Sequence, residues 1–251
     1  MSVKRHTTRV VQRMLGVAPP VPDPETWQLN EAVNFDLECI FVAVPKTGTT
    51  SVRSQIRPNG PYLIPRRHLN IVEIRDTLFA FLLLRATSNN HSFPTEDVAR
   101  TRDVRLEADE VFRNFFKFCS VRNPWARAVS LYFRKEGVQV ADRMSFEEFC
   151  LGHVSASDTC QHPTLHSNQI DWMTDEAGQI LVDYVYKMED FATAVGEIRE
   201  LTNGRLKLQA LEKNRNAASR SRDYRDMFSA RARNAIARAF EKDIDYFKYA
   251  F

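Results

Sequence analysis

The sequence has no long apolar run, and this absence excludes a membrane-spanning helix. Its longest run, from Leu78 to Leu84, is far shorter than the roughly 20 residues that cross a bilayer. The segment from Met1 to Gly16 is basic and weakly amphipathic, without the continuous apolar core of a secretory signal. We therefore expect neither a transmembrane segment nor a signal peptide.

Cysteine pairs and a strong net charge are also missing. The four cysteines are irregularly spaced without a C-x-x-C pair, and Cys39 and Cys119 fall in apolar segments. This pattern is typical of buried free thiols in a reducing compartment and argues against a zinc site. The 35 basic and 32 acidic residues leave a net charge of +3, which provides no overall field for binding nucleic acid.

Strand-like and helix-like segments alternate along the chain, which predicts a single α/β domain with a central parallel β-sheet flanked by helices. The expected strands cover about 37–44, 115–121, 180–185 and 207–211. The expected helices begin near residue 50 and after Asn70, and cover about 124–135, 189–201 and 229–240, with a short capped one at Ser145. Residues 88–105 are polar and expected to form a loop. Four prolines between Val17 and Pro24 indicate an extended linker, so we divide the chain into an arm (1–34) and a domain (35–251).

A predicted anion-binding loop follows the first strand, in the sequence V-P-K-T-G-T-T-S from Val44 to Ser51. Gly48 allows the tight turn that points successive backbone N–H groups at one anion. The next helix start adds partial positive charge, Lys46 adds a full charge, and the hydroxyls add donors. The lysine precedes the motif's single glycine, unlike the P-loop of nucleotide hydrolases. The loop therefore predicts a phosphate or sulfate site, with an ordinary strand-to-helix turn as the alternative.

A second motif of similar organisation, S-V-R-N-P-W-A-R-A-V-S-L-Y, begins at Ser120. Asn123 suits a helix cap and Pro124 the first helical position, which places Arg122 at the carboxyl end of a strand. Ligands of open α/β sheets bind at that end. Ser130 lies about two turns along the helix, where its hydroxyl is expected to meet the ligand held by Arg122. Two such anion sites suit a ligand with phosphates at both ends.

Together the two motifs resemble those of sulfotransferases that use 3′-phosphoadenosine 5′-phosphosulfate (PAPS), in the carbohydrate and heparan-type branch with its bacterial relatives. Two later segments resemble further parts of that family: the stretch from Gly178 to Phe191, and the stretch from Asp223 to Phe251 with D-x-x-x-F-x-Y-x-F at its end. The resemblance implies the P-loop-like PAPS-binding sulfotransferase fold. It also implies sulfuryl transfer to an acceptor hydroxyl, with a carbohydrate as the expected acceptor and a lipid-linked sugar or a small alcohol as the alternative.

The resemblance further implies a role for each residue of the two motifs. In this family the first loop holds the 5′-phosphosulfate of PAPS, and the arginine and serine of the second motif hold the 3′-phosphate. The matching residues here are Lys46, Thr47, Gly48, Thr49, Thr50 and Ser51 for the first site, and Arg122 and Ser130 for the second. Lys46 is expected to stabilise charge on the leaving oxygen. The family generally uses no metal, so none is expected. Eukaryotic relatives in the Golgi carry a membrane anchor, and its absence implies a cytoplasmic, bacterial enzyme.

Sulfuryl transfer also needs a general base, because a hydroxyl is a poor nucleophile while it keeps its proton. His68 is the first candidate, since bacterial relatives often carry a histidine in a similar H-L-x-x-x-E-I-R context. A helix-capping or surface role for His68 is the alternative. Some family members use glutamate, so Glu73 and Glu31 are also candidates. His162 and His166 lie in an irregular segment and are either acceptor contacts or plain loop residues.

Two other functions stay open at this level. A kinase-like phosphotransferase would need a metal-binding aspartate after a strand and a lysine after a second glycine, and neither is evident. A non-catalytic anion-binding protein would keep the loop without using a base. The two motifs in combination favour a PAPS-dependent sulfotransferase over both.

Overall fold

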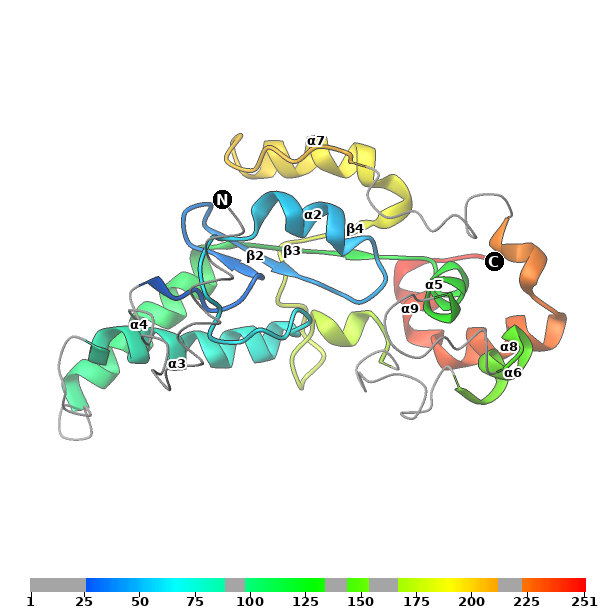
Figure 1. Cartoon of the computed structure of the whole chain (residues 1–251), viewed down its shortest axis with the longest axis horizontal. Coiled ribbons are helices and arrows are strands. Elements are labelled where there is room, and N and C mark those ends of the chain that lie inside the picture. Colours follow the sequence, from blue (N-terminus) through cyan, green and yellow to red (C-terminus); the bar gives the residue numbers. More distant parts are fainter. Residues whose placement is uncertain (1–25, 89–97, 134–143, 154–166, 212–222) are drawn as a thin grey trace, which may run out of the picture.

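The structure, a computed structural model, describes residues 26–88, 98–133, 144–153, 167–211 and 223–251. Four strands form one mixed sheet in the order β1-β2-β3-β4 (Figure 1). They are β1 (Val33–Asn34), β2 (Cys39–Val42), β3 (Phe116–Val121) and β4 (Tyr184–Lys187). Strands β2, β3 and β4 are parallel, whereas β1 is antiparallel to β2. The expected parallel sheet is therefore confirmed for three strands only. β1 is too short for its alternation to be visible in the sequence.

Helices surround this sheet and extend beyond it. In the described part of the chain they are α2 (Thr49–Ile56), α3 (Ile71–Ser88), α4 (Val98–Asn114), α5 (Pro124–Tyr132), α6 (Phe146–Glu148), α7 (Phe191–Leu201), α8 (Ala230–Ala239) and α9 (Glu241–Phe247). Short 3-10 turns occur at Ile170–Trp172, Met188–Asp190 and Tyr224–Met227, and a π-helical turn at Phe149–His153. None of the described helices is both long and apolar enough to cross a membrane.

The sheet is covered on both faces, as the sequence of its strands requires. On one face Phe41 and Phe118 pack with α2 and α7, and on the other Ile40 and Val42 pack with α3 and α4. Figure 1 shows α2 and α7 on one side of the strands and α3 on the other. Parallel strands that are buried on both faces read as continuous apolar runs, and every residue of β2 is buried.

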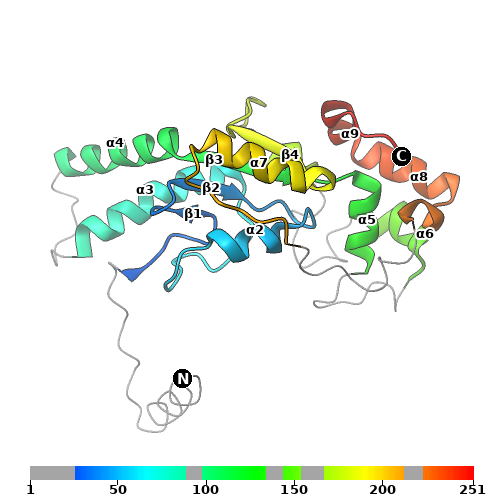
Figure 2. The same cartoon turned by 90° about the horizontal axis from the view of Figure 1, so that it is seen from above.

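A second group of helices lies beyond the carboxyl end of β3. Helices α5, α6 and α8 enclose a core that includes Trp125, Tyr132, Phe146, Phe149 and Phe240. Figure 2 shows this group at one end of the molecule and the α3–α4 pair at the other. The carboxyl ends of β2 and β3 therefore lie on the side of the sheet that is nearer to this helical group.

Several expected elements differ in the structure. Of the loop expected over residues 88–105, Ser88 ends α3, residues 89–97 lie outside the described residues, and residues 98–105 belong to α4. This part of α4 looks like a loop in the sequence because its buried face, which includes Val104 and Ala108, is narrow and its other residues are mostly polar. Residues 207–211 form no strand, and Leu208 packs as a single side chain beside α7. β4 begins at Tyr184 rather than near 180, because Ile180 makes only an isolated bridge.

The segment before β2 also belongs to the packed structure. Of the expected arm, residues 1–25 lie outside the described residues. Residues 26–34 contribute Leu29, Ala32 and Val33 to the core. The expected free thiols are confirmed for Cys39, Cys119 and Cys150, which are all buried. Cys160 lies outside the described residues.

Candidate functional site

The expected anion loop joins β2 to α2 and turns at two residues with a left-handed backbone. Lys46 has a φ of 68° and Gly48 a φ of 81°. A positive φ at a residue other than glycine is uncommon and marks stored strain, which is often functional. Helix α2 begins directly after Gly48, and no side chain caps it. The first N–H groups of a helix have no partner within that helix, so this end of α2 suits an anion.

Two arginines of the second motif fix the loop from one side. Arg127 Nε donates to the Pro45 carbonyl at 3.1 Å, and Arg122 Nη1 donates to the Lys46 carbonyl at 3.4 Å. In a trans peptide the C=O and the following N–H point in opposite directions. The two contacts therefore turn the N–H groups of Lys46 and Thr47 to the other side of the loop. The loop and the second motif thus form one assembly at neighbouring strand ends.

The hydroxyl residues of the loop differ in how deeply they are buried. Thr47 is only 1% exposed; its Oγ1 donates to the Val44 carbonyl at 2.9 Å and lies 2.7 Å from Ser120 Oγ. The Thr47 side chain therefore anchors the loop to β3. Thr50 is exposed, whereas Thr49 and Ser51 are each 6% exposed at the start of α2.

Gly48 lies against Met188, which follows β4. A Cβ at Gly48 would lie 3.2 Å from both Cγ and Sδ of Met188. Such a contact is tighter than ordinary van der Waals packing, and the φ of Gly48 is one that side chains rarely adopt. The backbone conformation therefore favours glycine here, and a larger residue would also require the flexible Met188 side chain to shift.

Arg122 lies at the carboxyl end of β3, as expected. Gln169 holds its backbone: Arg122 N–H donates to Gln169 Oε1, and Gln169 Nε2 donates to the Arg122 carbonyl, both at 2.8 Å. Burial lowers the pKa of Arg122, and the Glu189 carboxylate opposes that shift. Ser130 is half-buried on α5, about two turns after the start of the helix.

Asn123 connects the start of α5 to two distant segments. Its Oδ1 accepts from the N–H groups of Trp125 and Ala126, which makes it the helix cap that the sequence predicts. Its own N–H donates to Glu189 Oε1, and its Nδ2 donates to the Ala250 carbonyl, both at 2.8 Å. The two later segments that resemble the family thus stabilise the second motif.

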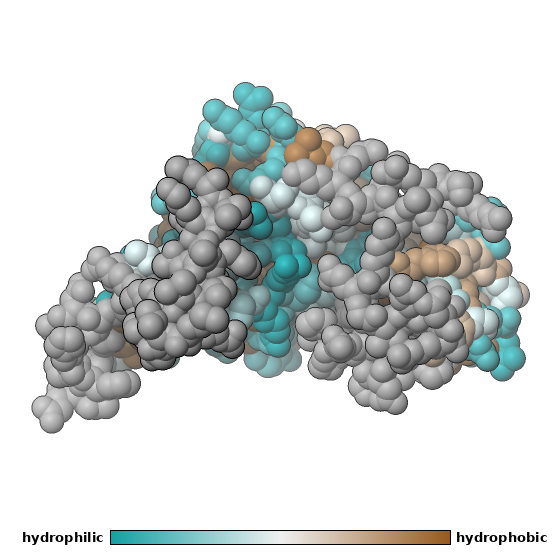
Figure 3. Space-filling view, in the orientation of Figure 1, coloured by the Kyte–Doolittle hydropathy of each residue, from teal (hydrophilic) through white to brown (hydrophobic). Residues whose placement is uncertain are grey.

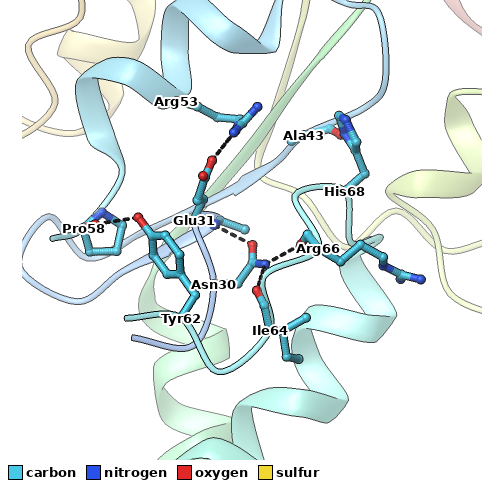
Figure 4. Close-up of polar contacts among 10 residues, drawn as sticks. Asn30, Glu31, Ala43, Arg53, Pro58, Tyr62, Ile64, Arg66 and His68 are labelled. Atoms are coloured by element: carbon cyan, nitrogen blue, oxygen red, sulfur yellow. Dashed lines mark hydrogen bonds and ion pairs between the residues drawn. The ribbon is translucent and has the colours of Figure 1, made fainter. Parts of the chain in front are cut away.

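His68 lies beside the strand that leads into the loop (Figure 4). Its Nδ1 is 2.7 Å from the carbonyl oxygen of Ala43, the residue after β2. A carbonyl only accepts, so Nδ1 carries the proton and Nε2 is the acceptor of the neutral ring. The ring meets Trp172 edge-on, with centroids 6.4 Å apart. These two contacts fix the tautomer and the orientation that a general base needs.

A buried asparagine holds the segment that carries His68. Asn30 Nδ2 donates to the carbonyls of Ile64 and Arg66, at 2.7 and 2.6 Å, and its Oδ1 accepts from Ala32 N–H at 2.9 Å (Figure 4). Asn30 thus ties residues 64–66 to the start of the sheet. No sequence motif marks Asn30, which lies in the expected arm.

The two glutamates considered as alternative bases have structural partners. Glu73 forms a capping box with Asn70: its Oε2 accepts from Asn70 N–H, and its N–H donates to Asn70 Oδ1, both at 2.8 Å. Its other oxygen pairs with Arg66. Glu31 pairs with Arg53 of α2, and both side chains are largely buried. Both glutamates are therefore engaged in contacts that stabilise the fold. His162 and His166 lie outside the described residues.

Sequence reasoning missed Arg127, Gln169 and Asn30 as residues that organise the site. A signal was present for Arg127, because an arginine in the otherwise apolar W-A-R-A-V is unusual, and it is 1% exposed. Gln169 had none, because its partners, the backbone of Arg122 and the carboxylate of Asp243, are far away in the sequence. Among the residues that the structure describes, no three His, Cys, Asp or Glu side chains gather as a metal ion would need.

A comparison with protein families agrees with this geometry. The profile of the sulfotransferase family matches residues 33–250, which include the loop, His68 and the second motif. Searches of curated proteins and of solved structures find no match. The family match extends from β1 to the penultimate residue, and the chain therefore belongs to the sulfotransferase family.

Proposed function

We propose that this sulfotransferase moves a sulfuryl group from PAPS to a hydroxyl of a carbohydrate. The contact between Arg122 Nη1 and the Lys46 carbonyl carries the proposal. It makes the anion loop and the second motif neighbours at the ends of two parallel strands, β2 and β3. One nucleotide with anionic groups at both ends suits such a paired site.

The first loop suits the phosphosulfate end of the donor. PAPS, when bound, supplies a sulfuryl group on a phosphate leaving group. The backbone N–H groups at the start of α2 and the hydroxyls of Thr49, Thr50 and Ser51 would hold this end. Lys46 would stabilise the charge that develops on the leaving oxygen. A sulfuryl group carries less negative charge than a phosphoryl group, so we expect transfer to proceed without a metal ion.

The second motif suits the 3′-phosphate. Arg122 provides a guanidinium and Ser130 a hydroxyl donor, and both are at least half-buried, where an ionic hydrogen bond is strong. The carboxylate of Glu189 opposes the lowering of the Arg122 pKa and so favours the charged guanidinium. The proposal therefore assigns Arg122 the choice of a 3′-phosphorylated nucleotide.

His68 would act as the general base. Its Nε2 would take the proton of the acceptor hydroxyl as the oxygen attacks sulfur. The Nδ1–H bond to the Ala43 carbonyl keeps Nε2 basic and stabilises the imidazolium that forms. Hydrophilic residues gather in the middle of one face of the molecule (Figure 3). The carbohydrate itself rests on the resemblance to that branch of the family.

Transfer of labelled sulfate tests the proposal. The protein is incubated with PAPS labelled with ³⁵S and a panel of neutral and acidic glycans, with a chelator present. We expect label on a glycan together with release of 3′-phosphoadenosine 5′-phosphate (PAP). Transfer of the γ-phosphate of ATP with magnesium to the same panel, without sulfate transfer, would instead support a kinase-like enzyme.

Arg122→Ala is expected to remove the preference for a 3′-phosphate. Loss of a charge-assisted contact costs about 1.5–3 kcal/mol, so the affinity for PAP should fall roughly ten- to a hundredfold. The affinity for adenosine 5′-phosphosulfate, which lacks the 3′-phosphate, should change much less. Calorimetric titration of both nucleotides measures the ratio. A variant that keeps the wild-type ratio would place the 3′-phosphate site elsewhere.

Gly48→Ala is expected to weaken both folding and nucleotide binding. A side chain at positive φ costs about 1–2 kcal/mol of the free energy of unfolding, and the contact with Met188 adds to this. The displaced loop should also bind PAP at least about tenfold more weakly. Denaturant unfolding and calorimetry measure the two effects.

Gly178→Ala is the matched control for this prediction. Gly178 has a φ of 79°, but no atom lies within 4 Å of the position that a Cβ would occupy there. The Gly178→Ala variant should therefore lose only the free energy of unfolding that a side chain at positive φ costs, and it should keep wild-type affinity for PAP. Equal losses of PAP affinity in the two variants would contradict a specific role for Gly48.

A further inference from the structure

A buried polar network joins helix α9 to both anion-binding motifs. Its centre is the pair Gln169 and Asp243, which are both 0% exposed. Asp243 lies on α9, and Gln169 precedes the 3-10 turn Ile170–Trp172. The proposed chemistry assigns no role to either residue. Two fully buried polar side chains at this place therefore need an explanation.

The side chain of Gln169 pairs with the backbone of Arg122, the first residue after β3. Its amide accepts from the N–H of Arg122 and donates to the carbonyl of Arg122, both at 2.8 Å. A neighbouring strand would satisfy a backbone in the same way, but here a single side chain does so. The backbone of Arg122 is thereby fixed at the point from which its guanidinium extends.

Asp243 fixes the orientation of that amide. Its Oδ2 accepts from Gln169 N–H at 2.8 Å and from Gln169 Nε2 at 3.1 Å, and its Oδ1 accepts from Ile170 N–H at 3.0 Å. A flipped amide would place its oxygen against the carboxylate, so only one orientation is possible. Burial raises the pKa of Asp243, and its hydrogen bonds to residues 169 and 170 oppose that shift, as does the charge of Arg127.

The same segment also holds the second arginine. Arg127 Nη1 donates to the Ser167 carbonyl at 3.4 Å, while its Nε donates to the Pro45 carbonyl. Segment 167–170 thus contacts both Arg122 and Arg127, and these two arginines hold the consecutive carbonyls of Pro45 and Lys46. A shift of this segment would change the position of the loop relative to Arg122.

We infer that Gln169 and Asp243 are positioning residues that set the spacing between the two anion sites. They act through Arg122 and Arg127 rather than on the nucleotide. The inference rests on the proposed function, because fixed spacing matters only for a ligand that occupies both sites. A bisphosphate should depend on this pair, whereas a monophosphate should not.

Gln169→Met tests this difference, because methionine has a similar length but makes none of the three amide hydrogen bonds. We expect the affinity for PAP to fall roughly ten- to a hundredfold, and that for adenosine 5′-monophosphate by less than about threefold. In an Arg122→Ala background the same change should cause no further loss of the ratio, because Arg122 is the group proposed to bind the 3′-phosphate and without it the spacing between the two sites no longer favours PAP. Calorimetric titration of both nucleotides gives the ratio.

Thr202→Val is the matched control for general destabilisation. Thr202 is also buried, and its hydroxyl bonds the Ile198 carbonyl at 2.7 Å and Leu206 N–H at 3.2 Å at the end of α7. This variant should lower the melting temperature and keep the wild-type ratio of the two affinities. If Gln169→Met does not fold, Asp243→Asn, which keeps the shape of the side chain, is measured in the same way.

A folded variant with a lower melting temperature and an unchanged ratio would overturn the inference. The proposed function is tested separately, by the titration of the wild-type protein with PAP. Wild-type protein that does not bind PAP would refute the shared nucleotide site, and with it the need for fixed spacing.

Discussion

Lys46→Met is expected to lower kcat by about 10²–10³-fold while the affinity for PAP falls less than about tenfold. The reason is that a charge directed at the leaving group acts mainly in the transition state, where negative charge develops. Methionine keeps much of the side-chain length and adopts a φ of 68° at a cost similar to lysine. The loop should therefore keep its shape. Single-turnover rates with saturating PAPS, together with PAP titrations, measure the two effects.

Lys207→Met is the matched control, since it removes an equal charge at an exposed position after α7. It should leave kcat within about twofold of wild type, as surface changes away from a site usually do. Wild-type turnover in Lys46→Met would refute the assigned role of this lysine. A loss confined to KM would instead indicate binding without transition-state stabilisation.

His68→Asn is expected to reduce kcat by about 10²–10⁴-fold, the usual contribution of a general base. The asparagine amide can still donate to the Ala43 carbonyl, so the local fold should survive and PAP should bind as in wild type. Wild-type activity should fall at acid pH with a single ionisation, because protonation of Nε2 removes the base. The residual activity of the variant should lack that ionisation. A pH–rate profile of both proteins measures this.

Glu73→Gln and Glu31→Gln are the comparisons for this prediction. Glu73→Gln can retain the capping contact and should keep kcat within a few-fold. Glu31→Gln weakens a largely buried ion pair and should mainly lower stability. If His68→Asn turned over normally while a glutamate variant were inactive, a carboxylate would be the base.

The elements around the loop between β2 and α2 could be predicted because their signals in the sequence are local. β2 is a continuous apolar run and β3 is largely apolar, and Asn123 with Pro124 is a helix start whose cap and first position can be read directly. The positive φ at Gly48 could also be predicted locally, because a glycine in a tight strand-to-helix turn often adopts this conformation. The capping box at Ser145 is confirmed for the same reason.

The elements that sequence reasoning missed depend on contacts between distant residues. β1 has two residues and is defined by its pairing with Cys39 and Ile40. Helix α4 has a weak apolar face, and its polar character resembled a loop. Asn30 and Gln169 bind backbone groups of residues more than 30 positions away, and no spacing in the sequence reveals this.

The burial of Thr47 is a related case. Its hydroxyl belongs to the loop motif in the sequence, but in the structure it contacts Ser120, a residue 73 positions later. Motif membership therefore predicted that Thr47 belongs to the loop, but only tertiary packing decided that its hydroxyl is buried against β3.

Calorimetric titration of the wild-type protein with PAP, compared with ATP and magnesium, tests the central claim most directly. The account predicts that PAP binds in the micromolar range with a chelator present and raises the melting temperature by mass action. It also predicts weaker binding of ATP under either condition. Absence of PAP binding, or tighter binding of ATP with magnesium, would contradict the proposed PAPS site.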